Sequence, residues 1–183
     1  MLAGCGGDDD DAGTGTTNAA PAGSEQPATA LKAAHLIPDL APLGFALLSQ
    51  QPDPAAVRLG QDVHQAAYEK KSAPPMILRL DVFVYPDEAI ARKDFATKSA
   101  ALKNPPPGAF GPNTQFRDAT ATAAGDESKA YQATGIDPQG NRVWLEAIRS
   151  GRVVFTIQLV AADKDSGAVR KGIADATLAR LEQ

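Results

Sequence analysis

Few residues of this 183-residue chain have the types and spacing that chemistry requires. A metal site needs clustered histidine, cysteine or carboxylate ligands, but His35 and His64 lie far apart, without a ligand partner at helical or hairpin spacing. The chain has no Gly-x-Ser-x-Gly or Ser-x-x-Lys motif for a nucleophile, and no glycine-rich phosphate loop between a strand and a helix. The carboxylate pair Asp126-Glu127 follows Gly125, a pattern more typical of a turn than of acid–base catalysis. We therefore expect no catalytic residue, no metal and no cofactor, and a protein that is not an enzyme.

The N-terminus contains the one cysteine of the chain, in the stretch Leu2-Ala3-Gly4-Cys5. This stretch resembles the lipobox of bacterial lipoproteins, in which a lipid is attached to the cysteine and the chain is cut just before it. The resemblance implies a diacylglyceryl group on Cys5, a membrane partner through that lipid, and a location on the extracytoplasmic side of the cell membrane. A charged and an apolar stretch normally precede such a site, and we expect them upstream of Met1. Residues 1–4 are then the remnant of a signal peptide.

A polar stretch follows the cysteine. Residues 6–30 contain no Val, Ile, Leu, Met, aromatic residue, Lys or Arg, so they have little to bury against the entropy cost of ordering. We predict a disordered, lipidated tether over residues 5–35. The run Asp8-Asp9-Asp10-Asp11 and Glu25 put five negative charges in this tether, and 18 basic and 17 acidic residues lie after residue 30. The acidic balance of the whole chain therefore describes a solvated spacer and not a surface for basic partners.

Residues 36–183 are long enough for a single domain with a core. They contain no run of 18 apolar residues, the length that a membrane-spanning helix needs. Alternating apolar residues predict strands, and Asp87 predicts the N-cap of a helix that ends before Pro105-Pro106-Pro107. The expected strands are 43–49, 63–70, 76–85, 129–134, 142–149 and 152–161, and the expected helices are 87–103 and 167–181. Val143, Leu145 and Ala147 are expected on the same face as Phe155 and its apolar neighbours. This order predicts an α+β fold, in which an antiparallel β-sheet has helices packed against it.

The order of elements, with the fragments Tyr85-Pro86-Asp87-Glu88-Ala89 and Ala124-Gly125-Asp126-Glu127-Ser128, resembles two groups of small extracytoplasmic bacterial domains. One is the PsbP/Mog1-like type, and the other comprises sensor domains appended to some bacterial serine/threonine kinases. The resemblance covers about residues 43–182. It implies a binding or assembly module, and it transfers no catalytic residue.

Three aromatic residues are the candidates for contact with a partner. Phe110 and Phe116 lie in a Pro/Gly-rich stretch, residues 104–118, which we expect to form a long loop. Trp144 shares a strand face with Glu146 and Ile148, and an exposed Trp144 would mark a binding surface. Each of these aromatic residues also has a plainer interpretation as a side chain folded onto the core.

The leading hypothesis is a lipid-anchored, non-enzymatic binding or accessory module of the cell envelope, with an unknown envelope protein or small ligand as its partner. The alternative is an extracytoplasmic sensor that binds a small ligand in a cleft near the 104–118 loop. A third alternative, an envelope hydrolase, requires His64 to lie beside Asp126 or Glu127 and a hydroxyl. Nucleic acid is not expected as a partner, because aromatic residues do not interleave with the basic residues Arg142, Arg149 and Arg152.

Overall fold

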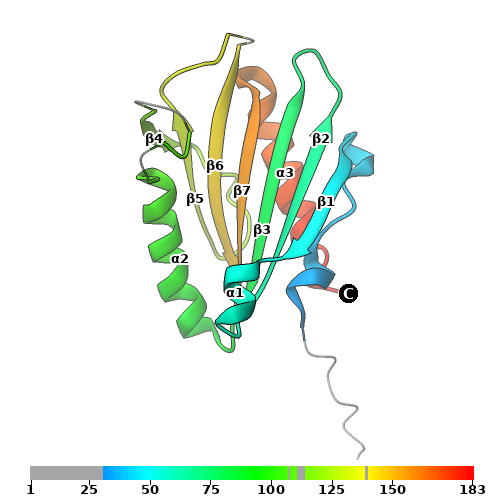
Figure 1. The fold of residues 1–183 in the computed structure, drawn as a ribbon, viewed down its shortest axis with the longest axis vertical. Helices are drawn as coiled ribbons and strands as arrows, with labels where there is room; N and C mark the ends of the chain where they lie inside the picture. Colours follow the sequence, from blue (N-terminus) through cyan, green and yellow to red (C-terminus); the bar gives the residue numbers. More distant parts are fainter. Residues whose placement is uncertain (1–30, 107, 111–113, 139) are drawn as a thin grey trace, which may run out of the picture. The chain divides into compact units, whose positions relative to one another are not determined.

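The computed structural model describes residues 31–106, 108–110, 114–138 and 140–183, with the backbone alone at 163–165. In this part of the chain, seven strands form one antiparallel sheet in the order β1-β2-β3-β7-β6-β5-β4 (Figure 1). The strands are β1 Ala46–Pro52, β2 Asp62–Lys70, β3 Met76–Val84, β4 Phe116–Ala119, β5 Glu127–Ala133, β6 Asn141–Ser150 and β7 Val153–Ala162.

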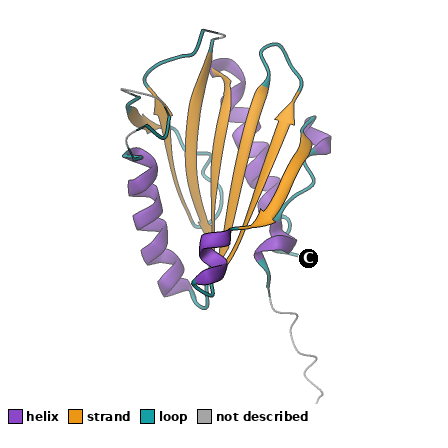
Figure 2. Ribbon diagram, in the orientation of Figure 1, coloured by secondary structure: helices purple, strands orange, loops and turns teal. Residues whose placement is uncertain are grey.

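Two long helices pack on opposite faces of this sheet (Figures 1 and 2). They are α2 Glu88–Lys103 and α3 Asp163–Leu178; a short helix α1 Pro54–Arg58 and the 3₁₀ turns η1 Ala33–Leu36 and η2 Ala41–Leu43 complete the fold. The predicted α+β class is therefore confirmed. No helix in the described ranges is both long enough and apolar enough to cross a bilayer.

Strand β7 explains why both faces need a helix. Its sequence is apolar at almost every position, and its side chains are buried on both sides of the sheet. Phe155, Ile157 and Leu159 point to one side and join Ile173 of α3 in the larger core cluster. Val154 points to the other side and packs with α2 in the smaller cluster. A strand with this pattern is stable only at the centre of a covered sheet. We call the two sides the α3 face and the α2 face.

Helix α2 forms as the sequence predicts. The Asp87 carboxylate accepts a hydrogen bond of 2.8 Å from the Ile90 amide, which caps the first turn. Ala91 and Phe95 are buried on the α2 face, and Asp94 pairs with Lys98 at 3.2 Å, one turn later.

One prediction about the sheet faces is wrong. We expected Val143, Leu145 and Ala147 to share a face with the Phe155 row, but the β6–β7 register sets Ile148 opposite Phe155 and Leu145 opposite Gln158. Both faces of β6 are covered, so apolar residues occur at odd and even positions, and periodicity alone does not identify the partner row.

Three boundaries also differ from the sequence prediction. The segment expected to be a loop to residue 118 contains the edge strand β4, Phe116–Ala119, which is too short to show a period. The last helix begins at Asp163 and not near Gly167, with Ala162 at the N-cap and no side-chain cap. The compact unit spans Leu31–Gln183 and takes in residues 31–35, with Ala33 buried in the larger core. The tether was predicted for residues 5–35, and its residues 5–30, including Cys5, lie outside the described residues.

A buried ion pair joins α3 to the sheet. Arg170 Nη1 lies 2.6 Å from Glu146 Oε2, and the two side chains are 4% and 0% exposed. The second Glu146 oxygen accepts hydrogen bonds from the Thr122 amide and hydroxyl at 2.7 and 2.8 Å. The Arg170 guanidinium also stacks 4.9 Å from the centre of the Trp144 ring. Helix, strand and the segment after β4 are therefore held at one buried point.

Removal of the carboxylate should be strongly destabilising. In Glu146→Ala the Arg170 charge stays buried without its partner, and we expect a loss of about 3–5 kcal/mol in the free energy of unfolding, measured by urea denaturation. The double variant Glu146→Leu with Arg170→Met should lose less, because no unpaired charge remains. Asp175→Ala, which breaks the exposed Lys171–Asp175 pair at 2.7 Å, is the matched control and should cost about 0.5 kcal/mol or less. Equal losses in Glu146→Ala and Asp175→Ala would contradict this account.

Candidate ligand-binding groove

The α2 face is only partly covered. Helix α2 packs on β4, β5, β6 and β7, and in the described part of the chain no helix covers the middle of β3, β2 and β1 on this face (Figure 1). Polar side chains fill this open area where a covered sheet would have apolar ones. The strand registers align them in two rows, Gln158–Arg79–Ala67–Ser49 and Thr156–Asp81–Gln65–Gln51. We call the seven polar residues of these rows the polar floor.

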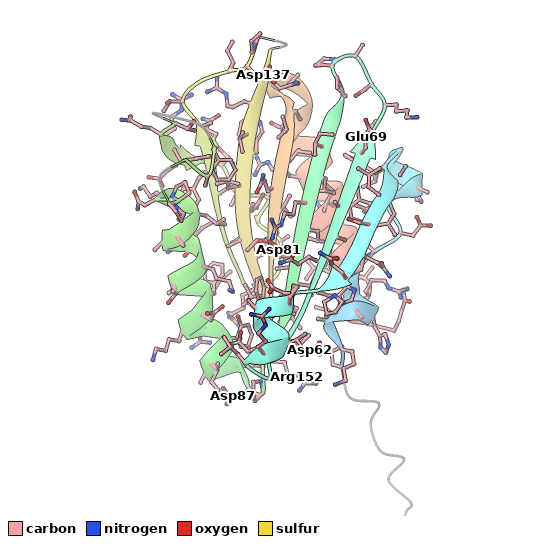
Figure 3. The ribbon with its side chains drawn as sticks, in the orientation of Figure 1. Asp62, Glu69, Asp81, Asp87, Asp137 and Arg152 are labelled. Atoms are coloured by element: carbon pink, nitrogen blue, oxygen red, sulfur yellow. The ribbon has the colours of Figure 1, made fainter. Side chains whose placement is uncertain are left out.

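The side chains of the polar floor are tied to one another. Asp81, which Figure 3 shows at mid-height in the sheet, accepts a hydrogen bond of 3.0 Å from Arg79 Nε and one of 3.4 Å from the Thr156 hydroxyl. Gln65 Nε2 donates to Asp53 Oδ2 at 2.6 Å. Arg79 is about half exposed, whereas Asp81 is 19% exposed. The floor thus combines a fixed carboxylate with a guanidinium that is open to solvent.

The pKa values of the two carboxyl groups of this region, Asp81 and Asp53, are shifted in opposite directions. Burial raises the pKa of Asp81 above its ordinary value of 3.8, against a smaller lowering by Arg79. At Asp53 the backbone amides of Ala56 and Ala55 lower the pKa, because they donate hydrogen bonds to the carboxylate at the start of α1.

Helix α2 lines one side of the floor with a charged cluster. Phe83 lies on β3 one residue row below Asp81. Lys98 Nζ lies 3.6 Å above the centre of the Phe83 ring and pairs with Asp94. The Tyr85 hydroxyl donates to the same Asp94 carboxylate. Burial, followed by this hydrogen bond, raises the pKa of Tyr85, so the phenol is neutral at physiological pH.

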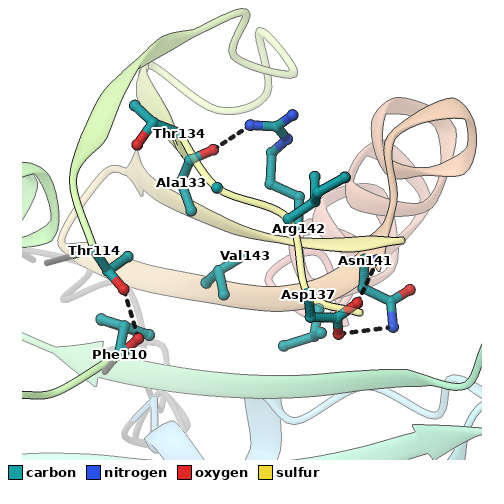
Figure 4. Close-up of a pocket in the computed structure, with 11 residues that line it drawn as sticks. Phe110, Thr114, Ala133, Thr134, Asp137, Asn141, Arg142 and Val143 are labelled. Carbon is teal, nitrogen blue, oxygen red and sulfur yellow. Dashed lines mark hydrogen bonds between the residues drawn. The ribbon is translucent and has the colours of Figure 1, made fainter. Parts of the chain in front are cut away.

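A pocket of about 350 Å³ opens at the upper end of the same face, near the turn between β5 and β6 (Figure 4). Phe110, Val143 and Val160 give it an apolar side. Its polar side holds Asp137 and Asn141. The backbone amide and the side-chain amide of Asn141 donate hydrogen bonds to the Asp137 carboxylate at 2.7 and 3.2 Å.

The Arg142 guanidinium and the side-chain oxygen of Asn141 also shape the upper pocket. The Arg142 guanidinium donates to the Ala133 carbonyl, which fixes its stem along the pocket wall. Asn141 is 5% exposed, and within the described residues its Oδ1 is a buried acceptor without a hydrogen-bond partner. A pocket with one apolar side and a few converging polar groups has the composition of small-molecule sites.

The three predicted binding residues separate in the structure. Phe110 lines the upper pocket, and Phe116 supports it from β4 with its ring edge-on at 5.2 Å between centroids. Trp144 lies on the other side of the sheet, 8% exposed beneath α3. The polar floor was not predicted as a site. Its signal was present in the charged residues Arg79 and Asp81, at alternate positions of an otherwise apolar strand.

Asp126 and Glu127 have structural contacts. Arg149, 3% exposed, donates to Glu127 Oε1 at 2.7 Å and pairs with Asp126 Oδ2 at 3.0 Å. Asp126 also accepts from the Gly151 amide at 2.8 Å, so the pair fastens the β6–β7 turn. Gly125 has a φ of +67°, and a Cβ there would lie 2.4 Å from the Arg149 carbonyl oxygen, so this position requires glycine.

The histidines are not part of such an arrangement. His64 lies on β2 opposite Val82, and no hydrogen bond or ion pair joins it to Asp126 or Glu127 among the described residues. His35 lies in η1, where its carbonyl accepts from Arg180 Nε at 3.1 Å. The described residues contain no group of three potential metal ligands.

Comparisons with known proteins identify the fold. No protein-family model and no curated protein sequence matches this chain. Among solved structures, it is similar to the extracellular domain of PknH from Mycobacterium tuberculosis, with a TM-score of 0.51 and 12% sequence identity over 81% of this chain and 92% of that one. At this identity the likeness shows a shared fold alone. It agrees with the predicted kinase-sensor-like architecture, while the PsbP/Mog1-like resemblance and the lipobox stay predictions.

Substitution of the floor carboxylate should reveal what its burial costs. Because the pKa of Asp81 is raised in the folded protein, the native state binds this proton more tightly than the unfolded chain. Stability is therefore lost as the pH rises from about 3.8 through the folded pKa, and the penalty is complete above it. We expect Asp81→Asn to unfold at a higher temperature than wild type at pH 7, with the difference vanishing below pH 3.8, in thermal unfolding followed by circular dichroism.

The matched control is Asp118→Asn, which alters an exposed carboxylate paired with Lys103 at 3.0 Å. Its effect should stay within about 0.5 kcal/mol across the same pH range. A destabilised Asp81→Asn at pH 7 would show that the contacts to Arg79 and Thr156 outweigh the cost of burial.

Proposed function

We propose that this chain is a lipid-anchored extracytoplasmic binding module that holds a small polar ligand on the α2 face. The observation that carries the proposal is the polar floor. A central strand of a seven-stranded sheet is normally covered and apolar, yet β3 places Arg79 and Asp81 in an open area between α2 and β1. Helix α2 therefore leaves room for a ligand on this face.

The chemistry of the floor indicates the class of ligand. Amide and hydroxyl groups from Gln51, Gln65 and Gln158, with Ser49 and Thr156, can both donate and accept hydrogen bonds. The positive charge of the Arg79 guanidinium is balanced by Asp81 at 3.0 Å. The floor therefore lacks the excess of positive charge that would favour a phosphate. Such groups suit a ligand rich in hydroxyl and amide groups, and the upper pocket adds an apolar surface at Phe110. An N-acetylated sugar chain has both features.

Binding without catalysis is supported by the contacts of the charged groups. The carboxylates after Gly125 hold Arg149, and Asp81 has fixed donors on both oxygens. The hydroxyl groups of Thr156, Thr122 and Tyr85 donate hydrogen bonds to carboxylates. Each of these carboxylates is also paired with a basic side chain, as in a structural contact and unlike a free general base. The architecture shared with an extracellular domain supports the proposed location.

Titration of the ¹⁵N-labelled protein with N-acetylglucosamine oligomers tests the ligand class. We expect amide resonances of Gln65, Arg79 and Thr156 to shift together. Arg79→Ala should weaken binding about tenfold, because a hydrogen bond from a charged group contributes about 1.5–3 kcal/mol. Arg152→Ala, an exposed arginine at the lower end of the sheet, is the matched control and should leave the affinity unchanged. Shifts confined to the α3 face, or displacement by inorganic phosphate alone, would overturn the proposal.

The anchor has its own test. The chain is expressed in bacteria from its gene with the upstream sequence included, and the cells are grown with an alkyne fatty acid. We expect label on the wild type and none on Cys5→Ala, because Cys5 supplies the only thiol in the chain. Equal protein amounts in both cultures, checked by immunoblot, are the control. An unlabelled wild-type protein would remove the anchor from the proposal and leave the ligand site untouched.

A further inference from the structure

Strand β3 brackets the polar floor with apolar residues. Four of its residues, at alternate positions, belong to the α2 face: Ile77, Arg79, Asp81 and Phe83. Arg79 and Asp81 are part of the polar floor. Ile77, which is 44% exposed, lies one residue row above it, and Phe83 lies one row below it. The polar floor therefore has an apolar row at each end.

Each apolar row leads into a cavity. The upper row pairs Ile77 with Val160, which lines the upper pocket. The lower row pairs Phe83 with Val63, and both of these residues line a groove of about 430 Å³, which we call the lower groove. The upper pocket and the lower groove thus share residue rows with the two ends of the polar floor.

The rest of the lower groove is formed by turns at the lower end of the sheet (Figure 1). Gly60 and Gln61 line it from the turn after α1, and Pro86 and Ile90 line it from the start of α2. Ile90 is 45% exposed, so a ligand in the groove can cover apolar surface that the fold itself leaves open.

The charged side chains that line the lower groove are of opposite sign. Lys32 is exposed, and Asp62 accepts a hydrogen bond of 3.1 Å from the Ala33 amide. The exposed side-chain amide of Gln61 can both donate and accept hydrogen bonds. The lower groove therefore combines apolar surface with hydrogen-bonding groups and has no excess of either charge among its lining residues, and it suits a ligand of the same kind as the polar floor does.

We infer that the lower groove is a second subsite of the ligand site and holds the far end of an extended sugar chain. This inference rests on the proposed function, because the occupant is the same neutral N-acetylated chain that the polar floor is proposed to bind. Ile77 and Phe83 are six residues apart on one strand, so the two apolar rows are about 20 Å apart. One sugar can cover only one of these rows, whereas a chain of several sugars can contact both.

Two lengths of ligand test the inference. N-acetylglucosamine oligomers of two and of six sugars are titrated into the full chain, with affinity measured by calorimetry and contacts by amide resonances of the ¹⁵N-labelled protein. We expect both oligomers to shift the Arg79 resonance and only the longer one to shift those of Gln61 and Ile90. The longer oligomer should bind about tenfold more tightly, because one ligand then joins two subsites.

A variant in the lower groove separates this gain from a statistical effect of ligand length. Ile90→Ser should lower the affinity for the six-sugar oligomer about fivefold, because the apolar contact in the groove is lost, and leave the affinity for the two-sugar oligomer unchanged. Leu59→Ser is the matched control, since Leu59 is 74% exposed at the same end and does not line the groove. It should change neither affinity. Thermal unfolding of both variants checks that the fold is intact.

The outcomes distinguish this inference from the proposed function. If the two-sugar oligomer binds at Arg79 and the longer one binds no more tightly, the inference is overturned and the proposed function stands. A gain with length that Ile90→Ser leaves in place, or shifts at Gln61 and Ile90 with the two-sugar oligomer, would also overturn the inference alone. Absence of binding by either oligomer would overturn both.

Discussion

One helix covers only part of a seven-stranded sheet, and the organisation of this domain follows from that mismatch. Strands lie about 4.8 Å apart, so the sheet is about 29 Å wide, whereas a helix with its side chains is about 10 Å across. On the α3 face, η1 and buried residues of the N-terminal segment, such as Leu36 and Leu40, extend the cover beyond α3. On the α2 face the described residues place only the short helix α1 beside α2, near the lower end, and the exposed middle of β1, β2 and β3 is polar there.

The buried pair between Glu146 and Arg170 fixes where α3 crosses the sheet. A charge in the core is stable only with a partner in fixed geometry, so α3 must cross β6 where Arg170 meets Glu146. The Thr122 hydrogen bonds hold the segment between β4 and β5 at the same point. On the opposite face, Ala147 of β6 packs with α2 in the smaller cluster. Both helices therefore lie over β6 and β7, one on each face. The part of the α2 face that α2 leaves open falls on β1, β2 and β3.

The sequence predicts local elements of this fold well and their lateral arrangement poorly. The alternation in Met76–Val84 and the cap at Asp87 determine β3 and α2 through neighbours a few residues away. The placement of β7 between β3 and β6 depends on contacts across more than 70 residues, such as Asp81 with Thr156. For this reason the charged positions of β3 could be noted in the sequence, but not recognised as part of a groove. Trp144 was a candidate for exposure because it shares a strand face with Glu146 and the opposite, Val143 face was expected to form the core.

The start of the compact unit and the upper pocket lie at opposite ends of the domain. Leu31, the first residue of the compact unit, lies at the lower end, while the pocket at Phe110 and Asn141 lies at the upper end. Strand β6 has ten residues, so the two ends are separated by about 30 Å. Under the proposed function, an extended ligand bound in the upper pocket would run from Val160 along the polar floor, which begins one residue row below it.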